Sequence, residues 1–227
     1  MGTGTIDLLE AVTLNQDEPP FAWDLLLGDS PMNHPSKKQA LLEAAIELLA
    51  KDGFWQTTTA SIAQEAGVAT GTLFTYFPTK NDLIDELYLT IKHEALAELQ
   101  REPKLHGSFE AVFREIHTRL LKWGSANPKK FLLMLQLRQG NQVSQRIHET
   151  IEDDWKDGHE WIKLGQQEGK LASFPTNLLL SIIHGHLEAV IQHNIQHNLS
   201  KKEVDEVATI SSEILWRYLS PKSKSPQ

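Results

Sequence analysis

The amino-acid sequence predicts an all-α protein with a small three-helix domain near its N-terminus and a larger helical domain after it. Three observations predict this fold. Apolar residues recur at helical spacing from about residue 37 onward, residues that begin and end helices divide the pattern into segments, and no segment alternates between apolar and polar residues as a strand does. A chain of 227 residues, 40% of them hydrophobic, is long enough for two domains with hydrophobic cores.

The composition excludes several classes of protein. The chain has no cysteine, so it forms neither disulfides nor a thiolate metal site. It has no run of roughly 18 apolar residues that could span a membrane. A secretory signal would require a Lys or Arg near the N-terminus, and none precedes Lys37. We therefore expect a cytoplasmic protein.

The charge is distributed unevenly along the chain. The net charge is −8, and residues 1–35 contain six acidic residues and no Lys or Arg. We expect residues 1–35 to be an acidic tail, either disordered or a leader, with a partner-binding segment as the alternative. Residues 221–227 are expected to be a second disordered tail. The remaining chain is nearly neutral, so net charge alone does not support binding to a polyanion.

Capping residues divide the first predicted domain, residues 36–82, into three helices at residues 36–53, 57–67 and 70–77. Ser36 and the run Thr57–Thr59 supply hydroxyl N-caps. Gly53 and Gly67 are typical of the left-handed residue that ends a helix. Pro78 breaks the chain after the third, very short helix.

The second predicted domain, residues 83–220, is helical throughout. Its helices are expected at about residues 79–102, 107–126, 128–137, 144–168, 177–197 and 204–218. The sequence Thr79-Lys80-Asn81-Asp82 is a capping box for the first of them. The helix at 177–197 is apolar nearly all round, and the last helix has a heptad-like apolar stripe.

The second and third helices have the spacing of a helix-turn-helix. Gly67 supplies the sharp exit from the second helix, where a Cβ would be strained. Leu73 and Phe77 lie four residues apart and face the core, so Thr72 and Tyr76 point away from it. A polar outer face on such a short helix is typical of a helix that reads a DNA groove.

Residues 36–88 resemble the N-terminal domain of the TetR family of transcriptional regulators. The matching stretch reads ALLEAAIELLAKDGFWQTTTASIAQEAGVATGTLFTYFPTKNDLIDELY. The resemblance implies a DNA-binding regulator, most simply a ligand-released repressor that binds a pseudo-palindromic operator as a homodimer. It also implies that the second domain binds a small, lipophilic effector molecule and forms the dimer through its last two long helices.

The resemblance also assigns roles to individual positions. In the family, the residue at Thr58 or Thr59 meets a DNA phosphate, and the positions of Tyr76 and Lys80 contact phosphates as well. The first recognition-helix positions, which approach base edges, correspond to Ala69, Thr70, Gly71 and Thr72. Two positions depart from the family pattern: Phe74 stands where tyrosine is common, and Thr75 stands where histidine or tyrosine is common.

The middle helices contain aromatic and Met residues that could line the effector site. These candidate ligand-binding residues are Phe113, Trp123, Phe131, Met134, Trp155 and Trp161. Each of them is also compatible with a place in an ordinary hydrophobic core.

Two alternatives to a ligand-responsive repressor remain open. One is a helical protein–protein adaptor that kept the fold. The other is a metal-responsive regulator, because His186, His193 and His197 fall on one helical stripe and the last two have the i, i+4 spacing that can chelate a metal. No cofactor is expected. An enzyme is not expected either, because the sequence has no nucleophile elbow, phosphate-binding glycine loop or paired-carboxylate motif.

Overall fold

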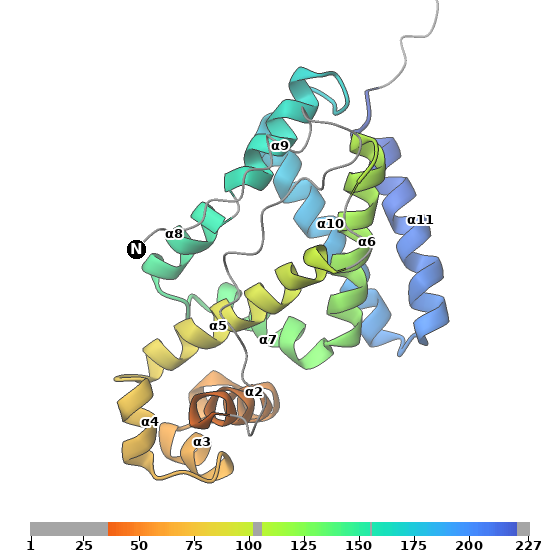
Figure 1. The fold of residues 1–227 in the computed structure, drawn as a ribbon. Helices are drawn as coiled ribbons and strands as arrows, with labels where there is room; N and C mark the ends of the chain where they lie inside the picture. The colour runs from red at the N-terminus through yellow and green to blue at the C-terminus, as the bar shows by residue number, and fades with distance from the viewer. Residues whose placement is uncertain (1–35, 102–105, 155, 222–227) are drawn as a thin grey trace, which may run out of the picture. The chain divides into compact units, whose positions relative to one another are not determined.

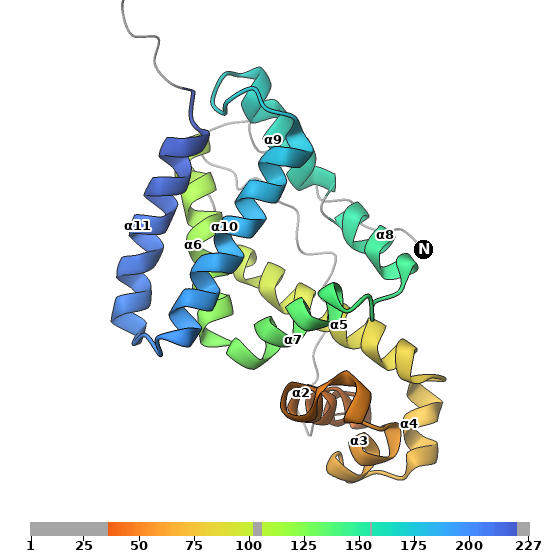
Figure 2. The ribbon, with the colours of Figure 1, turned by 180° about the vertical axis from the view of Figure 1, so that it is seen from behind.

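The computed structural model describes residues 36–101, 106–154 and 156–221. These ranges contain helices and no strands, which confirms the all-α fold (Figures 1 and 2). The predictions for residues 1–35 and for the tail beyond residue 221 lie outside the described residues.

The helices follow the predicted order, with labels as in Figure 1. Their bounds are α2 (Lys37–Gln56), α3 (Thr59–Glu65), α4 (Thr70–Tyr76), α5 (Lys80–Ala97), the 3-10 turn η2 (Glu98–Gln100), α6 (Phe109–Ala126), α7 (Pro128–Gln139), α8 (Gln145–Asp154), α9 (Lys156–Gln167), α10 (Thr176–Gln196) and α11 (Lys201–Leu219). The long polar helix predicted for residues 144–168 corresponds to α8 and α9, and residue 155 between them lies outside the description.

The chain packs as two compact units. The N-terminal unit contains the described residues up to Glu94 together with residues 127–151, and the C-terminal unit contains the described parts of residues 95–126 and 152–221. The division therefore falls within α5. It also places α7 in the same unit as α2, α3 and α4, and α7 packs against α2.

The core of the N-terminal unit is built from the apolar faces of short helices. Leu41 and Leu49 of α2 are fully buried, as are Ile62 of α3, Leu73 of α4 and Leu83 of α5. Each is a large side chain removed from water, and truncating such a residue to alanine typically costs about 2–5 kcal/mol. The positions of α3 and α4 therefore depend on these contacts.

A buried carboxylate fixes the turn before α8 within the same unit. Asp85 of α5 accepts a hydrogen bond from the backbone N–H of Ser144 at 2.9 Å and another from its hydroxyl at 2.6 Å. Asp85 is buried, so these charge-assisted bonds replace its lost hydration. The start of α8 is thereby attached to α5.

In the C-terminal unit, α6 packs closely against α10 and α11. Gly124 permits the approach to α10, because a Cβ at this position would lie 2.6 Å from Cδ1 of Ile191. Farther along, Trp161 stacks on Phe109 with ring centroids 4.2 Å apart and lies beside Phe113 at 6.4 Å. These aromatic contacts form the centre of the hydrophobic core of this unit.

A polar network crosses this core. Ser211 of α11 has its hydroxyl 2.8 Å from Nε2 of His117 on α6 and 2.9 Å from Nε2 of His186 on α10. Burial, and secondarily the nearby imidazole of His186, lowers the pKa of His117 from 6.5 to about 4. Burial also lowers the pKa of His186, partly offset by a hydrogen bond with Ser211. Both imidazoles are therefore neutral in the folded protein near pH 7.

This network predicts a loss of stability on acidification. Between pH 6.5 and 4 the unfolded chain binds a proton at residue 117 that the folded chain does not, so stability falls as pH falls through this window. From pH 7 to pH 5 we expect His117 to account for about 2 kcal/mol of the decrease in unfolding free energy. Urea unfolding of wild type and His117→Gln at both pH values and equal protein concentration measures this contribution. An equal pH dependence in the two proteins would contradict it.

Candidate DNA-binding surface

The turn between α3 and α4 has the geometry that its sequence predicts. Gly67 has a φ of +67°, a left-handed conformation that is strained for residues with a Cβ. The N–H of Gly67 donates to the carbonyl of Gln64 at 3.1 Å, and the N–H of Val68 donates to that of Ala63 at 2.9 Å. These bonds satisfy the free carbonyls at the end of α3. The chain can then turn sharply into α4.

The short helix α4 has one buried face and one exposed face. Leu73 and, just beyond the helix, Phe77 are buried, whereas Phe74 and Tyr76 are 44% and 42% exposed. The predicted base-reading and flanking positions Ala69, Thr70, Gly71 and Thr75 are exposed as well, and Thr72 is half-buried. The predicted contact residues of α4 therefore share a surface that solvent can reach.

Two threonine hydroxyls already have partners in the protein. Thr75 donates to the carbonyl of Gly71 at 3.0 Å. Thr58 is the N-cap of α3: its Oγ1 accepts from the N–H of Ser61 at 3.0 Å, and its own N–H donates to Oγ of Ser61 at 3.1 Å. Ser61 was not singled out from the sequence, although a Thr-x-x-Ser spacing at a helix start is a reciprocal cap. Thr58 is exposed and Thr59 is half-buried, and their phosphate contacts stay predictions.

Lys80, also predicted to meet a phosphate, makes its contacts inside the N-terminal unit. Its Nζ lies 2.5 Å from the carbonyl oxygen of Phe54 and 2.7 Å from that of Thr57. It also lies 4.0 Å from the centroid of the Phe54 ring. The residue is half-buried, and burial lowers the pKa of its ammonium.

The charge around this surface is low for a DNA-binding unit. Residues 36–82 contain four lysines and five acidic residues. One of the lysines, Lys38, pairs with Glu86 at 2.6 Å. The surface therefore offers hydroxyls, amides and aromatic rings more than positive charge.

Comparisons with known proteins agree with this geometry. Residues 41–87 match the family model described as bacterial regulatory proteins, tetR family, and residues 93–219 match the model described as tetracyclin repressor-like, C-terminal domain. A crystal structure of a putative tetR family transcription regulator from Shewanella sp. PV-4 is 32% identical, with a TM-score of 0.73 over 82% of this chain and 100% of that one. This chain belongs to the TetR family.

Two other relatives extend the comparison. The crystal structure of a TetR family transcription regulator from Marinobacter aquaeolei VT8 is 20% identical and has the same fold, with a TM-score of 0.72 over 82% of this chain and 96% of that one. The fatty acid metabolism regulator protein of Bacillus subtilis is 29% identical over 119 residues, which are 51% of this chain and 60% of that protein. These relatives are transcriptional regulators rather than enzymes, and this TetR-family chain is a DNA-binding transcriptional regulator.

The predicted effector residues of this TetR-family protein are distributed over both units. Phe113 and Trp161 are in contact in the C-terminal unit, where Trp123 is also buried. Phe131 and Met134 are buried in the N-terminal unit instead, and Trp155 lies outside the described residues.

Two aromatic residues that sequence reasoning did not select complete the cluster around Trp161. Phe109 stacks on Trp161, and Trp216 of α11 lies 5.5 Å from Phe113 between ring centroids. Phe109 could have been predicted, because it lies four residues before Phe113 and therefore on the same helix face. Trp216 comes from a different element, and its proximity follows only from the packing of α11 on α6.

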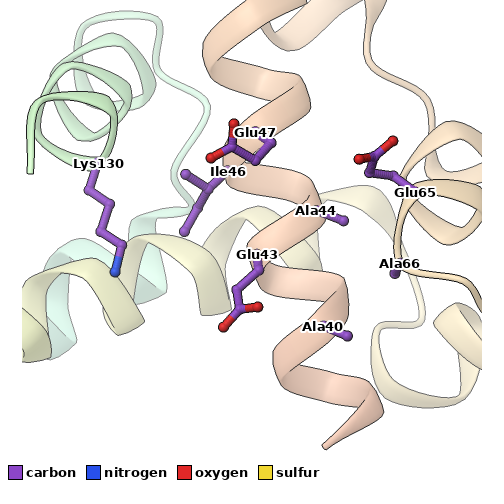
Figure 3. Close-up of a pocket in the computed structure, with 8 residues that line it drawn as sticks. All are labelled: Ala40, Glu43, Ala44, Ile46, Glu47, Glu65, Ala66 and Lys130. Atoms are coloured by element: carbon purple, nitrogen blue, oxygen red, sulfur yellow. The ribbon is translucent and has the colours of Figure 1, made fainter. Parts of the chain in front are cut away.

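A separate hollow of about 480 Å³ opens on the N-terminal unit (Figure 3). Its lining residues are Ala40, Glu43, Ala44, Ile46, Glu47, Glu65, Ala66 and Lys130. Figure 3 shows the small alanine side chains and the glutamates that line it. None of the predicted effector residues lines this hollow.

The three histidines considered for a metal site do not form one in the described structure. His186 bonds to Ser211 in the core, whereas His193 and His197 are exposed with ring centroids 4.2 Å apart. No three His, Cys, Asp or Glu side chains of the described ranges are placed to share a metal ion. Among the same residues, no helix is both long and apolar enough to cross a membrane.

Two glycines of the helix-turn-helix give a matched test of its backbone. Gly67→Ala places a Cβ on a left-handed residue and is expected to cost about 1 kcal/mol of unfolding free energy. Gly71→Ala lies inside α4 at ordinary φ with open space around the new Cβ, so it is expected to stabilise by about 0.5–1 kcal/mol. Thermal and urea unfolding of both variants measure the two signs. Equal shifts in the same direction would show that the turn geometry is not the deciding factor.

Proposed function

We propose that this regulator is a ligand-released repressor that binds a pseudo-palindromic operator as a homodimer. The observation that carries the proposal is the two-sided character of α4. Leu73 and Phe77 fix one side in the core, and Phe74 and Tyr76 project from the other into solvent. Aromatic rings exposed on a short helix that the core holds in place are typical of a surface that a large partner covers, and a DNA groove is such a partner.

The residues at the start of α4 would approach the base edges. Gly71 has open space where a Cβ would stand, so the backbone can come close to the DNA there. The Thr70 and Thr72 side chains can hydrogen-bond a base or touch a thymine methyl group. Phe74 can make only apolar contacts, and the hydroxyl of Tyr76 suits a phosphate oxygen.

Low charge gives this mode of binding a distinct salt dependence. Affinity that comes from hydroxyls, amides and apolar contacts releases few counterions. We therefore expect operator affinity to fall less steeply with added salt than for a repressor with a basic DNA-binding surface.

Two substitutions separate base reading from phosphate contact. Thr72→Ala is expected to reduce the preference for the operator over base-substituted versions of it, because it removes a base-edge contact. Tyr76→Phe is expected to weaken binding to all sequences by a similar factor, roughly tenfold or less, because it removes a phosphate contact. Fluorescence anisotropy with DNA from the region flanking its own gene measures both effects. The reverse pattern would overturn the two assignments.

The same DNA also tests the general proposal. A helical adaptor would give no mobility shift with any fragment from the flanking region, whereas a repressor gives a sequence-dependent shift. A metal-responsive regulator would change its affinity on addition of zinc or of a chelator. These outcomes separate the three functions without knowledge of the effector.

The dimer interface that we propose is on the last two helices. Ile210, Ile214 and Tyr218 lie on one face of α11 and are 58%, 56% and 62% exposed, and Leu178 of α10 is about half exposed. A contiguous apolar stripe of this kind favours burial against a second copy. Pairing across it would set two α4 helices about 34–36 Å apart, one turn of the major groove.

A charge placed in this stripe tests the dimer. Ile214→Glu is expected to convert the protein to monomers and to abolish tight operator binding, because one recognition helix alone contacts a single half-site. Lys202→Glu, an exposed position on the same helix, is the matched control and is expected to remain dimeric. Analytical ultracentrifugation and mobility-shift assays measure the two properties. An Ile214→Glu dimer would place the interface elsewhere.

We propose a small lipophilic molecule as the effector. Phe113 and Trp161 supply aromatic side chains to the core of the C-terminal unit, and the Bacillus subtilis relative is named as a regulator of fatty acid metabolism. A ligand that binds more tightly to a conformation unsuited to the operator lowers DNA affinity by that difference in binding free energy. Substitutions at these aromatic residues should alter the response to the ligand more than they alter DNA binding without it.

A further inference from the structure

We propose that Lys80 acts in operator binding as a positioning residue, which holds the segment from Phe54 to Thr58 at the start of α3 and does not neutralise a DNA phosphate. This inference rests on the proposed function, because it concerns how the DNA-binding surface is kept in shape. It replaces the expectation that Lys80 is a direct phosphate contact.

The first argument is the set of partners around the ammonium. Its two carbonyl partners, on Phe54 and Thr57, lie at 2.5 and 2.7 Å, and the Phe54 ring lies on another side at 4.0 Å. An ammonium group has three N–H donors. Two carbonyls and one aromatic face account for all three, and a phosphate could be reached only by breaking one of these contacts.

The second argument is the need for a cation at the end of α2. Gly53 has a φ of +78° within this helix, which interrupts its regular hydrogen bonding. The hydroxyl of Thr57 lies within hydrogen-bond distance of the carbonyls of Leu48 and Gly53, and Lys80 donates to those of Phe54 and Thr57. The C-terminal end of a helix carries partial negative charge, which a lysine ammonium complements.

The third argument is that Trp55, in the middle of this segment, does not anchor it, and the other anchor besides Lys80 is the buried Thr57. Between the two carbonyls bound by Lys80 lies Trp55, whose side chain is 84% exposed. Burial of Trp55 therefore does not anchor the chain here. The residue after Thr57 is Thr58, the N-cap of α3, so a shift of the Thr57 carbonyl moves the first residue of the helix-turn-helix.

The fourth argument comes from the other end of the lysine. Lys80 is the first residue of α5, where a positive charge near the helix is unfavourable. The carboxylate of Asp82 accepts from the N–H and hydroxyl of Thr79 at 2.9 and 2.8 Å and completes the cap of α5 without the lysine. The ammonium is free to reach α2, and the side chain joins the start of α5 to the end of α2.

Salt dependence distinguishes positioning from direct contact. The slope of log affinity against log salt is negative, and each lost phosphate contact makes it less steep by about 0.9. A positioning residue changes the affinity by a constant factor and leaves the slope as it was. The two roles therefore predict different results from the same titration.

The experiment uses the full-length protein and the DNA flanking its own gene. Lys80→Met keeps the aliphatic stem and removes the charge, and Lys51→Met removes the same charge from an exposed position of α2. We expect Lys80→Met to weaken binding roughly tenfold at every salt concentration with an unchanged slope. A slope that is less steep by about 0.9, or an unchanged affinity, would overturn the inference.

Amide hydrogen exchange without DNA supplies an independent readout. Lys80→Met is expected to speed exchange at residues 57–61 and not in α11, and Lys51→Met is expected to leave both unchanged. If Lys80→Met does not fold, Lys80→Arg decides instead, because it keeps the charge for a phosphate but does not fit the ammonium's contacts: weaker binding is expected. An unchanged affinity of Lys80→Arg would overturn the inference. Wild-type protein that shifts no DNA would refute the proposed function, whereas a wild-type shift together with a Lys80→Met salt dependence that is less steep by about 0.9 would refute the inference alone.

Discussion

Burial of Leu73 and Phe77 is the constraint on which the DNA-binding surface depends. A seven-residue helix has too few turns to be stable alone, so α4 exists because its inner side chains are covered by α2 and α3. Two buried positions four residues apart fix the rotation of the helix about its axis. Once that rotation is fixed, the positions that face outward follow from helical geometry, and these include Phe74 and Tyr76.

Features that depend on neighbours in the sequence could be predicted, and features that depend on distant partners could not. The left-handed Gly67 and the caps at Thr58 and Thr79 are local, and the structure has them where the sequence places them. Gly53 also has its expected left-handed conformation and interrupts the helix with a kink, and the assigned range of α2 runs across this kink to Gln56. The feature that the sequence could not indicate is Lys80, which comes 26 residues after Phe54 and donates to its carbonyl.

The predicted effector residues show the same limit. Aromatic residues on helices are expected to be buried, and Phe113, Phe131 and Trp161 are. Whether they meet depends on which helices pack together, and α7 packs with the N-terminal unit. Sequence spacing holds no information on which unit each helix joins, and the role of Phe131 at an effector site stays a prediction. Trp216 was missed for the converse reason, since α11 brings it to Phe113 from about 100 residues away.

The path of the chain limits how an effector could reach the DNA-binding surface. Within the described residues the chain passes between the two units at three places: inside α5, between α6 and α7, and near the end of α8. The first is a continuous helix whose opposite end carries Lys80, and the third leads back to α5 through the hydrogen bonds between Asp85 and Ser144. Two of the three connections therefore end on α5, whose first residue donates to the carbonyls of Phe54 and Thr57 just before α3. This makes α5 the first element in which to look for two arrangements that a ligand and DNA bias differently.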